Sequence, residues 1–191
     1  MASVLKVDKL DPQSGTALEI GTSGDTITVP SGATFNVAGT MQSGGVVVAN
    51  TPAFSAYLGS SQTPSVSTYT KVSIDTEYYD TDSAFDKDTN YRFTVPSGGA
   101  GNYFFYGKVE YTAVTANSRL MSVFYLNGVA VNQGRAQTSP GGTTDNYAQV
   151  SWSVNLSESD YVELWTYYTG EGGTRTFEAG KCTFLGYKLI T

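Results

Sequence analysis

Apolar and polar residues alternate with a period of two along most of this chain. Residues 146–154 (NYAQVSWSV) carry an apolar side chain at every second position, and residues 25–30 (DTITVP) repeat the pattern in a shorter run. This is the spacing of side chains on one face of a β-strand. Clusters of Gly, Pro, Asn, Ser and Asp separate the runs, and no long segment has a helical period. The pattern therefore predicts an all-β protein.

The chain changes in character near residue 50. Of its 14 Tyr, 9 Phe and 2 Trp, only Phe35 precedes residue 51. We therefore predict two domains, an N-terminal β-rich arm over residues 1–50 and a head over residues 51–191. The predicted strand segments of the head are 52–59, 68–80, 90–99, 102–114, 119–131, 146–169 and 177–191. Eight to ten strands over this length are typical of a two-sheet sandwich.

The strand-like pieces of the arm are too short and too poor in aromatics to form a core of their own. Ordering costs roughly 1.5 kcal/mol per residue, which burial at roughly 25 cal/mol per Å² does not recover here. Either the arm is flexible, or its apolar residues are buried between several copies of the chain. Alternating large apolar residues are unusual in disordered segments, so we favour an intertwined oligomer. The candidate contacts are Ile20, Ile27, Val29, Phe35 and Val37.

Two reversals in the head have recognisable turn chemistry. Asn127-Gly128 lies between two strand-like runs and predicts a type I′ hairpin turn, which needs positive φ at both positions. Residues 156–160 (LSESD) join the strand of Trp152 to the strand of Leu164. Both turns predict antiparallel neighbours.

Five motifs in the head, in the same order, resemble those of the C1q-like domain. Asn127-Gly128 matches the hairpin of that family, and Ser159 stands where the family favours Gly. The matching segments are PAFSAYL (52–58), YYDTDSAFDKDTNYRFTVPSGGAGNYFFYGKVEY (78–111), LNGVAV (126–131), SVNLSESDYVELW (153–165) and CTFLGYKL (182–189). Within the longest of them, the matching residues are Tyr79, Asp80, Phe93, Pro96, Gly101, Tyr103 and Phe105.

The resemblance implies a ten-stranded jelly roll of the C1q and tumour-necrosis-factor (TNF) type, assembled as a tight homotrimer. The sequence itself also indicates a partner subunit. Both registers of 103–111 and of 162–168 carry aromatics, whereas a sandwich needs only one apolar face per sheet, so the second face is available for an interface. A threefold axis through the heads would also bring three arms together, which would supply the apolar surface that one arm lacks.

Charge and composition exclude several classes of function. The formal net charge is −6 and no Lys/Arg cluster occurs, so we expect no nucleic-acid partner. No apolar run approaches the roughly 20 residues of a spanning helix, so we expect no membrane insertion. The N-terminus interleaves Lys with Asp and lacks an apolar signal-peptide core. The chain has no His and one Cys, Cys182, which excludes His-based catalytic triads and internal disulfides.

The arm resembles the stalk segments of bacteriophage tail fibres, on its texture and on residues 25–39 (DTITVPSGATFNVAG). Together with the absence of a leader and of disulfides, this predicts a non-enzymatic virion appendage located on the virion, either a phage fibre or a capsid decoration protein. Its arm would bind other virion proteins, and its head would face a host-surface glycan or protein. The alternatives are a free C1q-like glycan-binding lectin or adhesin, and a glycan-degrading tailspike enzyme.

Three groups of side chains are candidates for specific chemistry. The acidic loop 75–88 superficially resembles a calcium loop but lacks the central Gly and terminal Glu of an EF-hand. A calcium site here is therefore the less favoured hypothesis, and a solvated, turn-forming loop is the favoured one. A hydrolase would need paired carboxylates, for example Glu163 with Glu171 or Glu178. The candidate glycan-stacking residues are Trp165, Tyr167 and Tyr168, with Trp152 beside them; core and interface packing is the competing interpretation.

Overall fold

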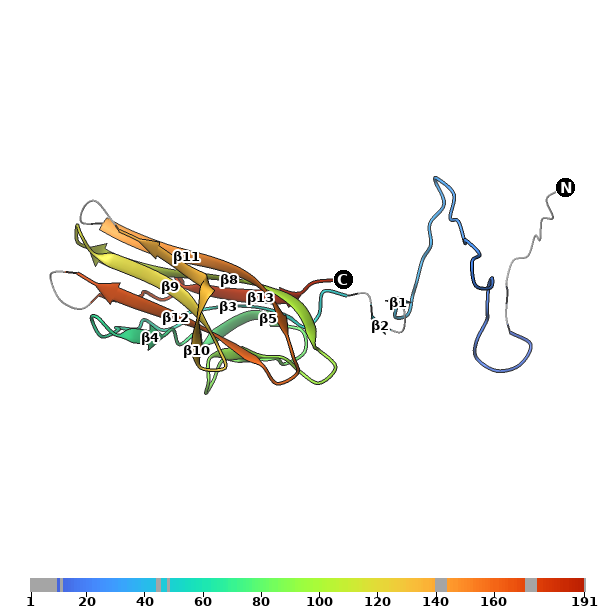
Figure 1. Ribbon diagram of the computed structural model, residues 1–191, viewed down its shortest axis with the longest axis horizontal. Coiled ribbons are helices and arrows are strands. Elements are labelled where there is room, and N and C mark those ends of the chain that lie inside the picture. Colours follow the sequence, from blue (N-terminus) through green and yellow to red (C-terminus); the bar gives the residue numbers. More distant parts are fainter. Residues whose placement is uncertain are drawn as a thin grey trace.

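The head is a sandwich of two antiparallel β-sheets (Figure 1). The computed structural model describes residues 10, 12–43, 46–47, 49–139, 144–170 and 175–190. Across these ranges the regular structure consists of strands, with no helix. No helix of the length and apolarity needed to cross a membrane occurs in them. The all-β prediction is confirmed.

One sheet has six strands, in the order β10-β9-β12-β7-β6, with β4 also paired to β12. Every pairing within it is antiparallel. Its members are β4 (Tyr69–Lys71), β6 (Phe85–Asp86), β7 (Arg92–Thr94), β9 (Arg119–Leu126), β10 (Val129–Thr138) and β12 (Tyr161–Thr169).

The other sheet has five strands, in the order β11-β8-β13-β3-β5. Its members are β3 (Ala53–Tyr57), β5 (Thr76–Asp80), β8 (Gly101–Val114), β11 (Thr144–Leu156) and β13 (Thr183–Lys188). Most neighbours in both sheets are distant in sequence, as in a jelly roll. The described residues thus form eleven strands in the two sheets, where ten were predicted, and several of the eleven have only two or three residues.

The core is built of aromatic rings between the sheets. Phe54 on β3 stacks on Phe85 and Phe93 of the other sheet, with ring centroids 4.7 and 5.3 Å apart. Phe184 on β13 meets the same ring edge-on at 4.9 Å. Alternate residues of β8 are buried along almost its whole length, so one face of each strand supplies the core.

The Asn127-Gly128 turn joins β9 to β10 as a two-residue hairpin in which Val129 pairs with Leu126. Both turn residues have positive φ, 50° and 79°. Positive φ at both positions is the signature of a type I′ turn, so the prediction is confirmed. Hairpins favour this mirror-image turn because it matches the twist of the flanking strands.

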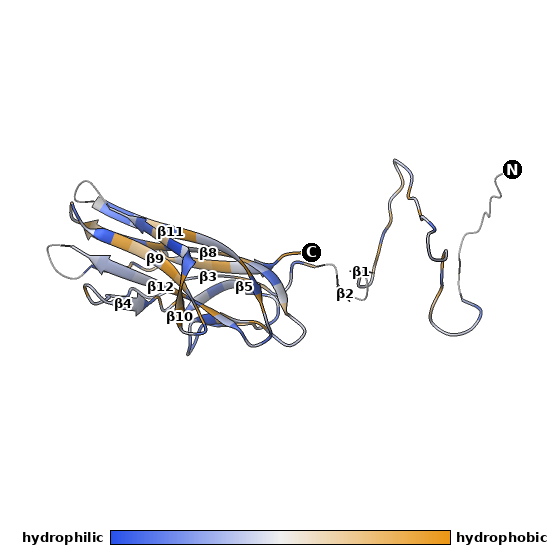
Figure 2. Cartoon of the chain, viewed as in Figure 1, coloured by the Kyte–Doolittle hydropathy of each residue, from blue (hydrophilic) through white to orange (hydrophobic). Residues whose placement is uncertain are grey.

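The arm contains little regular structure in the single chain. Its described strands are β1 (Gln42–Ser43) and β2 (Val46–Val47), which pair with each other. The strands predicted between residues 18 and 40 are not formed, because a strand needs a hydrogen-bonding neighbour and one arm provides none. Turns predicted in this segment are present, with positive φ at Gly24 and Gly32. Apolar positions occur at intervals along the arm (Figure 2).

Candidate functional site

The outer face of the five-stranded sheet carries a second set of aromatic side chains. On β8, Tyr103 and Phe105 point into the core while Phe104 and Tyr106 point outward and are partly exposed. Phe104 lies opposite Tyr187 of β13, with ring centroids 5.6 Å apart. This confirms that both registers of residues 103–111 are used, one for the core and one for the outer surface.

The aromatic surface continues across the neighbouring strands. Leu185 of β13 lies between Tyr106 of β8 and Ser55 of β3. Tyr57 of β3 packs against Tyr78 of β5 at 4.7 Å, and Tyr78 is 71% exposed. We call this surface the aromatic face; its members are Tyr57, Tyr78, Tyr79, Phe104, Tyr106, Leu185 and Tyr187. A contiguous surface of this kind is typical of a protein–protein interface.

The aromatic face lies at the end of the head where the arm enters. Pro52, which precedes β3, accepts a hydrogen bond of 3.0 Å from the backbone of Lys188 at the end of β13. Figure 1 shows the arm and the C-terminal end at this same end of the sandwich. Copies of the chain that met through the aromatic face would therefore also bring their arms together.

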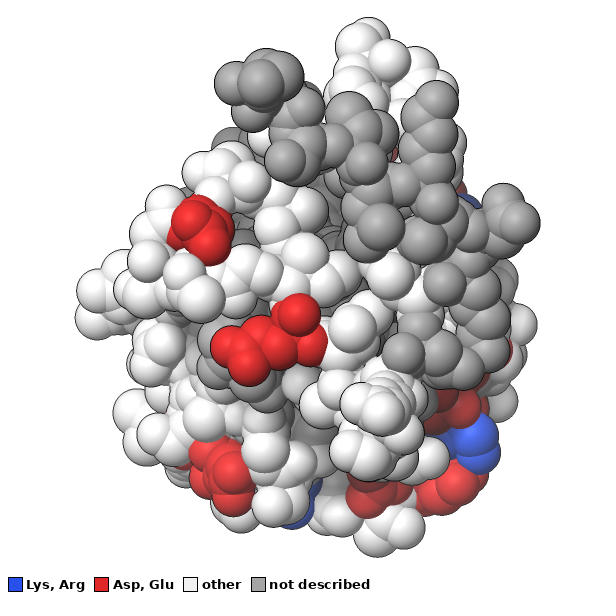
Figure 3. All heavy atoms as spheres, turned by 90° about the vertical axis from the view of Figure 1, so that its right-hand side faces the viewer, with Lys and Arg blue, Asp and Glu red and all other residues white. Residues whose placement is uncertain are grey.

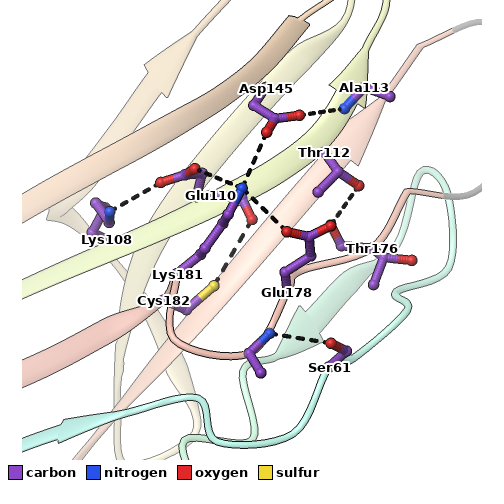
Figure 4. A network of polar contacts seen from close by, with 11 residues as sticks. Ser61, Lys108, Glu110, Thr112, Ala113, Asp145, Thr176, Glu178, Lys181 and Cys182 are labelled. Atoms are coloured by element: carbon purple, nitrogen blue, oxygen red, sulfur yellow. Dashed lines mark hydrogen bonds and ion pairs between the residues drawn. The ribbon is translucent and has the colours of Figure 1, made fainter.

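The opposite end of the same sheet carries charged side chains that satisfy one another (Figure 4). Lys181 Nζ lies 3.1 Å from carboxylate oxygens of Asp145 and Glu178, and 3.5 Å from Glu110. Lys108 pairs with Glu110 at 3.0 Å. Hydrogen bonds to Asp145 and then to Glu178 raise the pKa of Lys181 above its ordinary value. The network joins the ends of β8, β11 and β13, and its two lysines face three carboxylates, which leaves one net negative charge.

The outer face of the six-stranded sheet carries four partly exposed rings. Trp165 of β12 stacks on Tyr125 of β9 with centroids 4.5 Å apart, and Tyr69 of β4 lies 4.9 Å from Tyr167 of β12. Tyr69 and Tyr125 are 6.3 Å apart, which links the two pairs. We call Tyr69, Tyr125, Trp165 and Tyr167 the ring cluster.

Beside the ring cluster lies a buried carboxylate. Glu163 is 4% exposed, and its two oxygens contact Lys71 Nζ at 2.5 Å and Trp165 Nε1 at 2.9 Å. Through these two contacts the carboxylate holds Trp165 and Lys71 in place. In the adjoining ring cluster, burial, followed by the neighbouring Tyr69 and Glu163, raises the pKa of Tyr125.

Two of the predicted glycan contacts, Trp165 and Tyr167, lie together in the ring cluster. Tyr168 does not: it is 1% exposed and packs on Tyr111 in the core at 5.5 Å. Tyr168 points inward because consecutive residues of a strand face opposite sides. Trp152 also faces the core, where it stacks on Phe124 at 6.3 Å. The prediction for Tyr168 is thus corrected.

The predicted arm contacts are all exposed in the single chain, from 38% for Val37 to 71% for Phe35. Four of them, Ile20, Ile27, Val29 and Phe35, line one open apolar hollow of about 340 Å³. They are therefore neighbours in space as well as in sequence, and their apolar surface is left without cover.

The acidic loop uses its carboxylates to hold its own backbone. Asp80 accepts hydrogen bonds from the backbone of Ala84 and Phe85, at 3.1 and 2.8 Å. Although burial alone would raise it, hydrogen bonds from Thr89 and Asn90 lower the pKa of Asp86. Within the described ranges, no group of three or more Asp, Glu or Cys is placed to hold a metal ion.

The predicted carboxylate pairs are separated or lie outside the described residues. Glu163 belongs to the six-stranded sheet, whereas Glu178 pairs with Lys181 at the end of the other sheet. Glu171 lies outside the described residues.

Several members of these surfaces were not singled out from the sequence. Tyr69 and Tyr125 belong to strands far from Trp165 in the chain, so only the pairing of β12 with β4 and β9 brings them together. The sequence placed them in strand-like segments but did not indicate which neighbours they would meet.

No protein-family model matches the chain, and no curated protein matches its sequence. Among solved structures, it is similar to the globular domain of zebrafish complement 1qA protein, with a TM-score of 0.52 and 16% identity over 72% of this chain and 97% of that one. Murine APRIL gives a TM-score of 0.51 and 12% identity, over 72% and 98%. Eiger TNF from S. frugiperda gives 0.50 and 13%, over 72% and 91%. These likenesses show the fold, a C1q/TNF-like jelly roll, which agrees with the resemblance drawn from the sequence motifs.

Proposed function

We propose that this chain is a structural appendage protein that forms a homotrimer, with the C1q/TNF-like head turned outward and the arms wound together into a stalk. The observation that carries the proposal is the coincidence of two uncovered apolar surfaces, the aromatic face and the arm hollow. The aromatic face adjoins the point where the arm enters the head. A single mode of association through that face would cover both surfaces.

The phage-virion role is supported by the character of the arm. Its described residues from Gln13 to Gln42 are all exposed, and its turns are set by glycines rather than by contacts with the head. An arm of this kind gains order from copies of itself or from a particle to which it binds. In the proposed role, the arm attaches to other virion proteins and the head is presented to a host surface. The protein acts mechanically and by adhesion, without catalysis.

The second candidate is a free C1q-like lectin or adhesin without a particle. The ring cluster on the six-stranded sheet favours it, because partly exposed Trp and Tyr rings suit the faces of sugars. The two functions assign different roles to the arm. In an appendage protein the arm binds a particle, whereas in a free lectin it does not need to.

The trimer is tested by sedimentation velocity or native mass measurement of the full chain at micromolar concentration. We expect a species of about three times the 20.4 kDa of one chain. Replacing Tyr187 with Asp places a charge in the aromatic face and should give a monomer that still unfolds cooperatively. Gln137→Asp, on the outer side of the other sheet, is the matched control and should stay trimeric. A wild-type monomer would overturn the proposal.

The virion role is tested separately by electron microscopy of phage particles with a label on the head. Labels at fixed positions on capsid or tail, in multiples of three, are the expected result. Purified particles without the chain, together with strong glycan binding by the isolated protein, would instead favour the lectin.

A further inference from the structure

We propose that the outer face of the six-stranded sheet binds an acidic glycan, specifically a polysaccharide containing uronic acid. The ring cluster would pack against the C–H face of a sugar, and Arg135 would bind its carboxylate. The inference deepens the proposed attachment role and rests on it for its purpose, since it names the class of receptor. The site itself is built within one chain.

The rings and Arg135 lie over the sheet. Met121 and Val123 of β9 face the outer side, because they alternate with the inward Ser122 and Phe124, yet each is only 1% exposed. Outward residues this well covered must lie beneath larger side chains. Val123 pairs with Trp165 and Met121 with Tyr167, so the ring cluster supplies much of the cover. The result is a broad apolar surface rather than isolated rings.

Arg135 reaches across this surface. It projects from β10, next to Val123, yet its Nη2 lies 3.8 Å from Met121 Sδ and 3.4 Å from the Tyr69 hydroxyl on β4. Its guanidinium is therefore held among the rings while the side chain remains exposed. Neither contact neutralises its charge.

Arginines gather on this side of the head. Arg119 stands 5.9 Å above the Tyr167 ring and donates a hydrogen bond of 2.7 Å to Gln137. Arg92 pairs with Glu163 across the strands, which places it on the same face, and it stacks over Tyr161 at 4.1 Å. In the part of the chain that the structure describes, none of these arginines forms an ion pair with Asp or Glu.

The charge of this face contrasts with the rest of the chain. The formal net charge is −6, and among the charged side chains visible from the arm end the acidic ones predominate (Figure 3). Among the described residues, two carboxylates share this face. Glu163 is paired with Lys71. Asp86, opposite Arg92 on the edge strand β6, accepts hydrogen bonds from Thr89 and Asn90. Unpaired guanidinium groups in an acidic protein indicate an anionic ligand by charge complementarity.

Uronic acid fits both features of the site. Its carboxylate is attached directly to the pyranose ring, so the anion and the C–H face lie within one sugar residue. Here, likewise, the guanidinium of Arg135 lies within hydrogen-bond reach of a ring-cluster hydroxyl. Guanidinium also matches the planar geometry of a carboxylate.

The test is calorimetric titration of the full chain with a galacturonic acid hexasaccharide at low salt. A neutral glucose hexasaccharide and a sulfated oligosaccharide of equal length are the comparison ligands. We expect binding of the uronate that weakens with added salt, and little binding of the neutral sugar. Equal binding of the neutral sugar, binding of the sulfated sugar alone, or no binding at millimolar ligand would each overturn the proposal.

Variants locate the binding to this face. Arg135→Ala should weaken uronate binding about tenfold, as loss of a charge-assisted hydrogen bond would, and Arg135→Lys should retain part of it. Trp165→Ala should also weaken it, and thermal unfolding checks that each variant folds. Lys188→Ala, on the other sheet, is the charge-matched control. Unchanged affinity in a folded Arg135→Ala variant would refute the assignment.

Oligomeric state is measured on the same samples. A trimer that binds no uronate would remove the ligand assignment and leave the proposed appendage intact. A monomer that binds it would remove the appendage and leave the site.

Discussion

Ser159 adopts a left-handed backbone conformation, with φ of 68°, in the reversal between β11 and β12. Its amide donates a hydrogen bond of 3.0 Å to the carbonyl of Val95, which holds the turn in place. The sequence motif marked this position, because Ser stands where C1q-like domains favour Gly. The structure supplies the physical reason, since a side chain makes positive φ costly.

We predict that Ser159→Gly raises the free energy of unfolding by up to about 1 kcal/mol, because Gly accepts this φ without strain. Urea unfolding followed by circular dichroism would measure the change. Ser157→Gly in the same turn, where φ is not positive, is the control and should leave stability unchanged or lower it. Equal destabilisation by both substitutions would show that Ser159 is unstrained.

Cys182 gives a prediction on pH. Burial raises the pKa of its thiol to about 11, from an ordinary value of 9.0. Between these values the unfolded chain loses the proton while the folded chain keeps it, so stability falls as pH rises, by at most about 1.4 kcal/mol per pH unit. Burial also raises the pKa of Tyr103 to about 12, which extends the loss to higher pH.

The measurement is urea unfolding at pH 8, 9, 10 and 11 for the wild type and Cys182→Ala. The variant starts from a lower stability because it loses packed atoms, but its stability should fall less steeply above pH 9. Identical slopes would mean that the thiol does not contribute to the alkaline loss.

At the level of elements, β13 depends on a residue without a side chain. A Cβ on Gly186 would lie 2.4 Å from the Phe105 ring and 3.0 Å from the Phe54 ring. Because these rings fill the space above Gly186, the strand can lie beside β3 and β8 only with a residue that has no side chain at this position. The sequence predicted a strand over this segment, but the contact of Gly186 with the two rings is a property of the assembled sheet.

Gly186→Ala should lower the free energy of unfolding by about 1–3 kcal/mol, because the added methyl overpacks the aromatic core. Thermal unfolding of the head would report it. Gly39→Ala, where a Cβ meets no atom within 4 Å, is the control and should not alter that transition. If Gly186→Ala had the stability of the wild type, the ring packing would have to be looser than described.

At the level of the whole molecule, arm and head should be separable. Phe35→Asp introduces a charge among the predicted stalk contacts and should make the arm sensitive to limited proteolysis, while the thermal unfolding of the head is unchanged. The control is Ser31→Asp, in the turn between the arm's apolar runs. A variant arm as resistant as that of the wild type would show that Phe35 is not buried between chains.

The alternation of residues along the chain was enough to predict an all-β head, its two-sheet form and the Asn127-Gly128 turn, because strand period and turn chemistry are local properties. It also placed aromatics on both faces of β8 and β12. The residues that meet on each face were decided by non-local pairing: β12 brings Trp165 to Tyr69 and Tyr125, and puts Tyr168 in the core. Pairing over such distances depends on the packing of the whole sandwich, which no short stretch of sequence contains.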